Sequence, residues 1–161
     1  MRNIIKVGMA ELNIIREPGI LTTLGLGSCV GVILYDRVVK IGGLAHIMLP
    51  NSKQIRNNEN KAKFADTGIQ LLLDRMMTIG CSRPRIIAKI AGGSQMFSFQ
   101  NDNEMMKIGK KNILATKKML NLLEIPIIAE DTGGNYGRTI EFHTTDGRLV
   151  IKTIGHGVHE I

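Results

Sequence analysis

Aromatic residues are scarce in this sequence of 161 residues, which has no tryptophan, two tyrosines and four phenylalanines. Proteins that bind single-stranded nucleic acid stack bases on aromatic side chains set among basic ones, and no such stretch is present. No recognition-helix or zinc-finger pattern is present either. Although the formal net charge is +7, we therefore expect no nucleic-acid binding, and we interpret most of the lysines as a solvated basic face.

Long apolar runs and cysteines are scarce as well. No run approaches the roughly 20 apolar residues that a membrane-spanning helix needs, and the first residues lack an apolar signal core that ends at a small-residue cleavage site. The two cysteines, Cys29 and Cys81, are too few for a disulfide framework and fit a reducing compartment. We expect a cytoplasmic protein without membrane insertion, folded as one domain over residues 1–161.

Apolar periodicity predicts two helices and about eight strands. The helices are expected over residues 63–79 and 107–124, where apolar residues recur at helical spacing. The second helix is crowded with lysines, which form either a solvated face or a docking surface for an acidic protein. Several strands are joined by hairpin turns, such as the one around Asp146-Gly147, and hairpins make strands antiparallel. This pattern predicts an α+β fold with helices packed on sheet.

Motifs for cofactors and metals are weak. The glycines of the segment 25–27 precede a predicted strand, where a dinucleotide-binding motif requires a helix. The segment 131–138 lacks the Gly-Lys-Ser/Thr end of a P-loop. His156 and His159 form a weak candidate for a metal site, because no further ligand group is evident. We expect no metal and no cofactor, and a disordered or partner-contacting segment at residues 155–161.

The most informative stretch is TTLGLGSC, which ends at Cys29 and is followed by an apolar run, a polar break and the run GGLAHIMLP. The two apolar runs predict a β-hairpin. If Asp36 and Arg37 form a two-residue turn, Cys29 lies opposite Leu44. His46 is then a diagonal neighbour of Cys29 on the same face of the sheet, because side chains alternate with period two. A three-residue loop would turn His46 to the other face.

A thiol close to an imidazole is a known arrangement for a nucleophile. The thiolate is the reactive form, and the histidine lowers the pKa of the thiol and transfers its proton. Gly25 and Gly27 let the backbone approach a substrate closely and aim N–H groups at a developing oxyanion. The alternative is that Cys29 is a small buried hydrophobic residue and His46 a satisfied core group. The residue types alone leave both interpretations open.

The segment GLGSCVGVILYD followed by GGLAHIMLP resembles the signature of the CheD family, the chemoreceptor glutamine deamidases of bacterial and archaeal chemotaxis. The N-terminal VGMAELNI and the central IAGGSQMF resemble further blocks of this family, as do the segments 107–112 and 131–138. These blocks occur in family order, so the resemblance covers nearly the whole chain.

The resemblance implies a Cys/His/Thr triad. Its cysteine corresponds to Cys29 and its histidine to His46. Its threonine stands six residues before the cysteine, at Thr23, and the adjacent Thr22 is the alternative hydroxyl. In this reading Thr23 orients His46, the role that an Asp or Asn has in other thiol triads.

Four further residues are candidates for the site. Backbone groups at Gly27 and Ser28 are expected to support the oxyanion. Phe97 and Phe99 stand in a polar loop, where they either pack beneath the loop or form part of a substrate groove. The resemblance favours the groove.

The resemblance also implies a three-layer α/β/β sandwich and an activity. The expected enzyme is a protein-glutamine glutaminase that converts glutamine side chains of methyl-accepting chemotaxis receptors to glutamate through a thioester, without a cofactor. The implied partners are the cytoplasmic helices of these receptors and the phosphatase CheC. The alternative is a mainly non-catalytic binding module that engages and stimulates CheC, and the presence of all three triad residues favours the enzyme.

Overall fold

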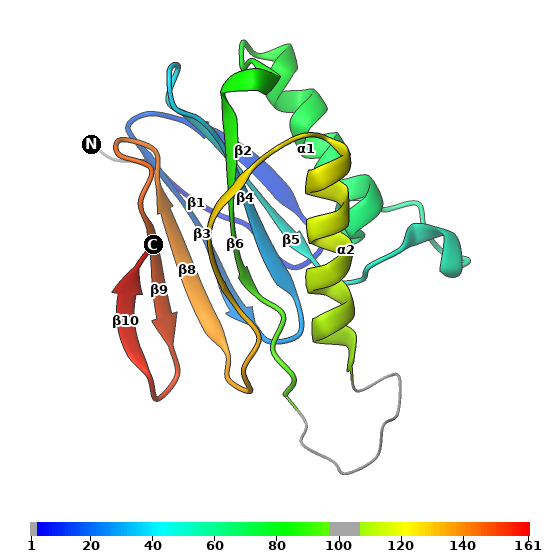
Figure 1. The fold of residues 1–161 in the computed structure, drawn as a ribbon. Coiled ribbons are helices and arrows are strands. Elements are labelled where there is room, and N and C mark those ends of the chain that lie inside the picture. Colours follow the sequence, from blue (N-terminus) through cyan, green and yellow to red (C-terminus); the bar gives the residue numbers. More distant parts are fainter. Residues whose placement is uncertain (1–2, 97–106) are drawn as a thin grey trace.

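The structure is a computed structural model that describes residues 3–96 and 107–161. These residues form two α-helices and two five-stranded sheets. Figure 1 shows the helices on one side of a middle sheet and the second sheet on its other side. The expected α+β fold is confirmed, and its layers follow the expected α/β/β order.

The middle sheet has the strand order β2-β5-β4-β6-β7. Every residue of its three central strands is buried, because layers cover both faces, and such strands read as continuous apolar runs. β6 and β7 are parallel, whereas the other neighbours are antiparallel. The strands are β2 (Leu12–Arg16), β4 (Val30–Asp36), β5 (Ile41–Ile47), β6 (Ile86–Gly92) and β7 (Ile127–Thr132).

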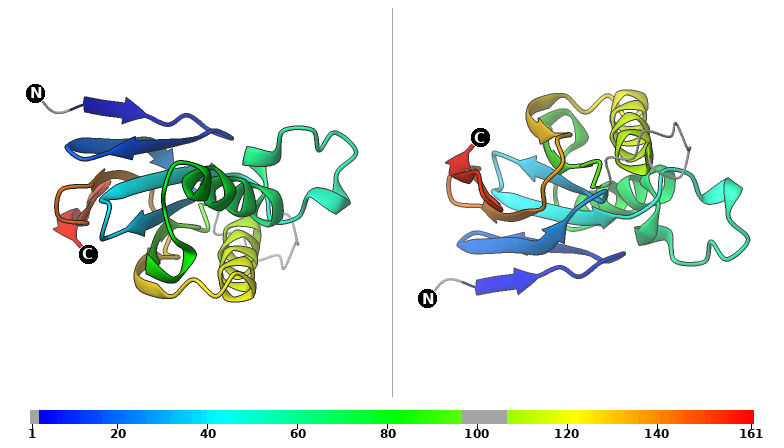
Figure 2. Two further views of the ribbon diagram at one scale, coloured as in Figure 1. Left: turned by 90° about the horizontal axis from the view of Figure 1, so that it is seen from above. Right: turned by 90° about the horizontal axis from the view of Figure 1, so that it is seen from below.

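The outer sheet has the order β1-β3-β8-β9-β10, and the two views of Figure 2 show β1 and β10 at its opposite edges. β1 and β3 are parallel, and the other neighbours are antiparallel. The strands are β1 (Asn3–Lys6), β3 (Gly19–Leu26), β8 (Arg138–His143), β9 (Leu149–Thr153) and β10 (Gly157–Glu160).

The two helices lie where the periodicity predicted them. α1 (Ala65–Thr78) buries one apolar face, which includes Ile69, Leu72 and Met76, against the middle sheet. α2 (Ile108–Leu122) buries fewer apolar side chains and instead buries polar ones, a feature that becomes important at the site. Short 3-10 helices lie in the connections of the described chain, among them η1 (Ser52–Gln54), η2 (Lys61–Lys63) and η3 (Arg83–Arg85).

The hydrophobic core is divided by the middle sheet into two clusters. Successive residues of a strand point to opposite faces, so Val32 and Leu34 pack toward the helices, whereas Ile33 and Tyr35 pack toward the outer sheet. The space between the two sheets is therefore filled from both sides, and a residue of the middle sheet that faces it can touch the outer sheet.

The turn between β4 and β5 differs from the predicted one. Asp36 pairs with Ile41, so the turn consists of the four residues 37–40 and the predicted two-residue turn is wrong. The physical reason is the carboxylate of Asp36, which accepts hydrogen bonds from the amides of Val38 and Val39 and thereby stabilises a local Asx-type turn.

The segment near the end of the chain also differs from the expectation. Residues Gly157–Glu160 form strand β10, which pairs with β9, so the expected disorder is wrong. Two side-chain contacts accompany this pairing: the ring of His156 lies 4.3 Å from that of Tyr136, and His159 Nε2 lies 2.8 Å from a carboxylate oxygen of Asp131. Glycine content alone predicted mobility, but pairing with a neighbouring strand overrode it.

Candidate active site

Cys29 lies in the short loop between β3 and β4, directly before the first residue of β4. Its side chain is half-buried and packs against the cluster between the two sheets. The thiol therefore stands at the edge of the inter-sheet space, where a substrate can reach it from outside.

His46 lies on β5 and is fully buried. It pairs with Gly31, which is two residues after Cys29, so the thiol and the imidazole are diagonal neighbours on one face of the middle sheet. The predicted partner of Cys29, Leu44, pairs with Ile33 instead. The turn is longer than predicted by an even number of residues, so the register changed while the face did not.

Thr23 contacts His46 from the outer sheet. This residue is on β3 and is fully buried, and its Oγ1 lies 2.7 Å from His46 Nδ1. The same Oγ1 donates a hydrogen bond of 2.6 Å to the carbonyl of Val7. A hydroxyl has one proton, and because Val7 receives it, the imidazole must donate from Nδ1 to Oγ1.

This arrangement fixes the tautomer of His46. With the proton on Nδ1, the other ring nitrogen, Nε2, carries a lone pair. Among the described residues, this buried Nε2 has no hydrogen-bond partner. The imidazole is thus oriented by the outer sheet, and Nε2, on the other side of the ring from Nδ1, keeps a free lone pair.

The alternative hydroxyl, Thr22, does not contact the histidine. Its Oγ1 donates to the carbonyl of Ile140 on β8, because adjacent residues of a strand point to opposite faces. Between the two threonines, the geometry places only Thr23 at His46.

Burial makes both members of the pair neutral. It raises the pKa of the Cys29 thiol above its ordinary value of 9.0 and lowers the pKa of His46 below its ordinary value of 6.5. The resting state at neutral pH is a thiol and an uncharged imidazole. The sequence-based expectation that the histidine lowers the pKa of the thiol is therefore not met in the resting protein, where desolvation dominates.

Three backbone carbonyls of the cysteine loop, residues 27–29, are held by neighbouring segments. The amide of Ser94 donates to the carbonyl of Gly27 over 2.8 Å, and the amide of Gly93 donates to that of Cys29 over 2.8 Å. The side-chain amide of Asn112 on α2 donates to the carbonyl of Ser28 over 2.9 Å.

The close approach of β6 to this loop depends on glycine. Gly92 has a φ of +110°, and a Cβ at this position would lie 2.3 Å from the carbonyl oxygen of Cys29. Any larger residue would push the two segments apart. The glycine at position 92 therefore lets the end of β6 pass close to the cysteine loop.

The carbonyls of residues 27–29 accept hydrogen bonds, whereas two backbone amides of the same loop have no acceptor among the described residues. Within the described part of the chain, no hydrogen bond from the amide of Ser28 or Cys29 is found. In a trans peptide the carbonyl and the following N–H point in opposite directions, so anchoring the carbonyls of Gly27 and Ser28 aims these two amides away from the anchors. Two N–H groups next to the thiol are therefore available to a negatively charged oxygen.

Of the four other candidate site residues, two lie in the cysteine loop and two fall outside the described residues. Gly27 and Ser28 lie in the cysteine loop as expected, whereas Phe97 and Phe99 fall outside the described residues. Within residues 3–96 and 107–161, no group of three or more His, Cys, Asp or Glu side chains is placed to hold a metal. In the same residues, no helix is long and apolar enough to cross a membrane.

Comparisons with known proteins show the family to which the chain belongs. A family model described as CheD chemotactic sensory transduction matches residues 48–153. The chain is 58% identical, over 98% of both chains, to the probable chemoreceptor glutamine deamidase CheD of Caldanaerobacter subterraneus subsp. tengcongensis. The chain belongs to the CheD family. It is also 53% identical to the chemoreceptor glutamine deamidase CheD of Halalkalibacterium halodurans over the whole length of both chains.

A further CheD relative, the chemoreceptor glutamine deamidase of Bacillus licheniformis, is 48% identical over 99% of this chain and 95% of its own length. Thr23, Cys29 and His46 precede the residues that the CheD family model matches. The alignments with these relatives extend across all three positions, so the site lies within the part of the chain that resembles them.

Sequence reasoning missed two groups at the site. The carbonyl of Val7, which receives the proton of Thr23, carries no signal in the sequence because any residue type supplies a carbonyl. Asn112 was noted only as part of a segment that resembles the family. The signal that could have identified Asn112 is a polar residue at a position where the helical spacing places the buried face of the helix.

Proposed function

We propose that this protein is a chemoreceptor glutamine deamidase, in which Cys29 is the nucleophile, His46 the acid and base, and Thr23 the residue that orients His46. The observation that supports this most is the hydrogen bond between Thr23 Oγ1 and His46 Nδ1. It leaves a free lone pair on the buried Nε2 of an imidazole that lies diagonally from the half-buried Cys29 on one face of the middle sheet. The names of the relatives, which are chemoreceptor glutamine deamidases, supply the substrate class.

The reaction begins with proton transfer. His46 Nε2 takes the proton of the Cys29 thiol, and the thiolate attacks the carbonyl carbon of a glutamine side chain. Because burial keeps both groups neutral at rest, the nucleophile forms only as the substrate arrives. Meanwhile the bond from Nδ1 to Thr23 stays in place and stabilises the imidazolium.

The carbonyl oxygen of the substrate becomes negatively charged in the tetrahedral intermediate. The amides of Ser28 and Cys29 are the donors that we assign to it, since they lack other partners among the described residues. Removal of one such donor in other hydrolases costs about 100-fold to 1000-fold in rate. In this assignment Gly27 contributes through its anchored carbonyl, which orients the amide of Ser28.

Ammonia and glutamate are the products. His46 returns its proton to the amide nitrogen and the C–N bond breaks. Ammonia departs, and the substrate remains bound to Cys29 as a thioester. His46 then takes a proton from water, whose oxygen attacks the thioester carbon. The C–S bond breaks, the thiol regains its proton and glutamate is released. The sum is one amide and one water converted to one carboxylate and one ammonium ion, because the carboxylic acid formed gives its proton to ammonia, and no cofactor takes part.

The decisive experiment uses purified cytoplasmic fragments of chemoreceptors, which are incubated with the wild-type protein, with Cys29→Ala and with the control Cys81→Ala. Peptide mapping by mass spectrometry then counts glutamines converted to glutamates. We expect conversion by the wild type and by Cys81→Ala, and none by Cys29→Ala. Conversion by a folded Cys29→Ala variant, or none by the wild type with Cys29 reduced, would contradict the proposal.

Binding of the phosphatase CheC, which the family resemblance implies, belongs to the same proposal. A protein that acts mainly as a CheC-binding module would bind CheC equally well as wild type and as Cys29→Ala and would convert no receptor glutamine. Adding CheC to the receptor assay and measuring its binding in parallel separates this function from catalysis.

A further inference from the structure

Asn112 is a fully buried polar residue in the N-terminal half of α2, on the face that packs against the middle sheet. Its side-chain nitrogen donates two hydrogen bonds, one to the carbonyl of Ser28 over 2.9 Å and one to the carbonyl of Met48 over 3.0 Å. An amide nitrogen has two protons, so both are used. The proposed mechanism assigns this residue no role.

The two carbonyls lie on either side of the nucleophile. Ser28 precedes Cys29 in the chain. Val30 pairs with Ile47, so the next step of the register places Met48 opposite Cys29. Asn112 therefore joins the cysteine loop to the end of the neighbouring strand, with both bonds directed from the helical layer.

A planar peptide unit turns this contact into a constraint on the site. The carbonyl of Ser28 and the amide of Cys29 belong to one trans peptide, so they point in opposite directions. Holding that carbonyl toward α2 aims the amide of Cys29 away from α2, toward the open side of the loop. The contact thus fixes the direction of a donor that Asn112 itself does not touch.

A second contact holds the N-terminal end of α2 close to the segment that anchors the cysteine loop. A Cβ at Gly109 on α2 would lie 2.3 Å from the carbonyl oxygen of Ser94, and the amide of Ser94 in turn holds the carbonyl of Gly27. The position of α2 relative to the loop is therefore set by direct backbone contact, which places the side chain of Asn112 within reach of Ser28.

The remaining atom of the side chain argues against a purely stabilising role. Asn112 Oδ1 is buried and has no hydrogen-bond partner among the described residues, and burying an unpaired acceptor costs free energy. Exchanging the oxygen and nitrogen would place an acceptor against two carbonyl oxygens, so the donors must face the loop. An apolar residue would avoid the unpaired oxygen but would release both carbonyls.

We propose that Asn112 is a positioning residue of the deamidase, which holds the peptide between Ser28 and Cys29 so that the amide of Cys29 points at the developing oxyanion. This inference rests on the proposed function. It assigns to the helical layer a part in catalysis, although the nucleophile, the base and the orienting hydroxyl all come from the two sheets.

The test compares Asn112→Ala with Thr116→Ala. Thr116 lies one turn further along α2, is also fully buried and has an unpaired hydroxyl among the described residues, so its truncation disturbs the same helix face without touching the loop. Each variant is assayed for deamidation of the receptor fragment, for thermal unfolding, and for alkylation of Cys29 by iodoacetamide across pH. Alkylation needs the thiol and its base but no oxyanion donor.

We expect kcat to fall about 10-fold to 100-fold in Asn112→Ala, with KM, alkylation rate and its pH profile unchanged, and no such fall in Thr116→Ala. If Asn112→Ala does not fold, Asn112→Leu, which retains the volume without the donors, replaces it. Equal deamidation by Asn112→Ala and the wild type, or a parallel loss of deamidation and alkylation, would overturn the inference. A wild type that deamidates no receptor would overturn the proposed function itself, which is a separate outcome.

Discussion

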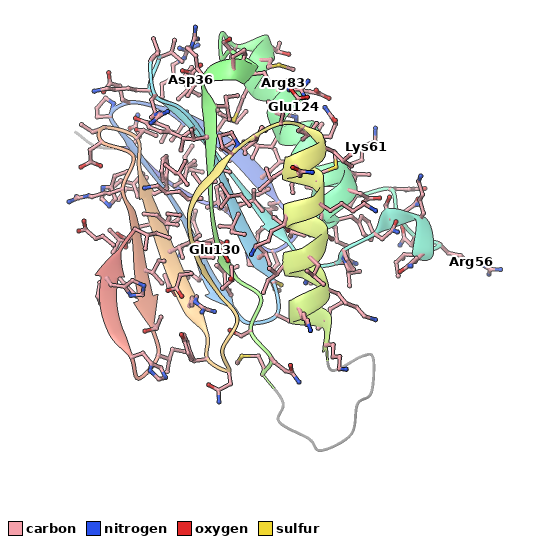
Figure 3. All side chains as sticks on the ribbon, in the orientation of Figure 1. Asp36, Arg56, Lys61, Arg83, Glu124 and Glu130 are labelled. Carbon is pink, nitrogen blue, oxygen red and sulfur yellow. The ribbon has the colours of Figure 1, made fainter. Side chains whose placement is uncertain are left out.

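The two cysteines of this protein carry the same thiol group but differ in exposure, in neighbouring side chains and in position in the fold. Cys29 stands half-exposed at the edge of the inter-sheet space, on the same face of the middle sheet as a neutral imidazole. Cys81 is buried between the middle sheet and the helices, 7% exposed. They also lie toward opposite ends of β4: Cys29 directly precedes it, and Cys81 lies near Asp36 at its other end, which Figure 3 labels.

Three charged side chains act on Cys81, namely those of Asp36, Arg16 and Arg85. Burial, together with the negative charge of Asp36, raises the pKa of this thiol to about 11, and the positive charges of Arg16 and Arg85 oppose the rise only in part. Asp36 itself is tied to Arg85 by an ion pair of 2.9 Å. Under the proposed mechanism, the comparison predicts that Cys81, beside an ion pair, is unreactive, whereas Cys29, beside a neutral and oriented base, is the reactive thiol.

The largest difference is expected in alkylation. With iodoacetamide at neutral pH, Cys29 should react on the order of 100-fold faster than Cys81, because Cys81 is reached only through local opening and is almost entirely protonated. Peptide mass spectrometry after timed quenching gives both rates from one sample. Equal rates would remove the distinction between the two sites and favour a binding module.

A smaller loss is expected for Thr23→Val, which retains the shape of the side chain and removes the hydroxyl. His46 Nδ1 and the carbonyl of Val7 would lose their shared partner, so deamidation should fall about 10-fold as the imidazole loses its orientation. The kcat of receptor-fragment deamidation measures this. Thr22→Val is the matched control, since that hydroxyl bonds only to the carbonyl of Ile140 in the described chain, and the proposed role of Thr23 requires this variant to remain active.

The pH dependence should show which protonation states react. Protonation of His46 removes the base, and because burial lowers its pKa below 6.5, kcat/KM should fall only as pH drops below that value. The alkaline limit should lie above 9.0, since burial raises the pKa of the Cys29 thiol. Rapid alkylation of Cys29 at acidic pH would indicate a thiolate–imidazolium pair at rest and would contradict the neutral pair.

The smallest change is expected for Asp36→Asn. Without the carboxylate, one cause of the raised pKa of Cys81 is removed, so alkylation of Cys81 should rise several-fold while that of Cys29 stays constant. The free energy of unfolding should also fall, because charge-assisted hydrogen bonds to Arg85 are lost. An Arg16→Gln control should change the alkylation of Cys81 in the opposite direction.

Much of the fold was predictable because its signals are local. The helical spacing in residues 63–79 marked α1, and the apolar runs on both sides of Asp36 marked the hairpin of β4 and β5. The predicted turn was too short by two residues, yet His46 lies on the predicted face of the sheet. An even change in turn length leaves the face unchanged, because side chains alternate with period two. The strand β10 was missed because pairing with a distant strand outweighs local glycine content.

The site was predictable only in part, for the same reason. Cys29 directly precedes β4 and His46 lies on β5, the two strands of one hairpin, so their proximity follows from a short-range pattern. The contact of Thr23 with His46 joins two different sheets, and only the family resemblance pointed to it. The anchors at Gly93 and Asn112 come from segments more than 60 residues further along the chain, a distance over which periodicity carries no information.

The bond between Thr23 and His46 has a consequence for how the protein tolerates change. It crosses the interface between two layers whose shared core consists of interlocking apolar side chains, and a hydrogen bond tolerates only a few tenths of an ångström of displacement. Apolar packing accepts larger shifts when side chains are exchanged for others of similar volume. Under the proposed mechanism, substitutions deep in the inter-sheet core, far from the thiol, can therefore abolish turnover in a protein that still folds.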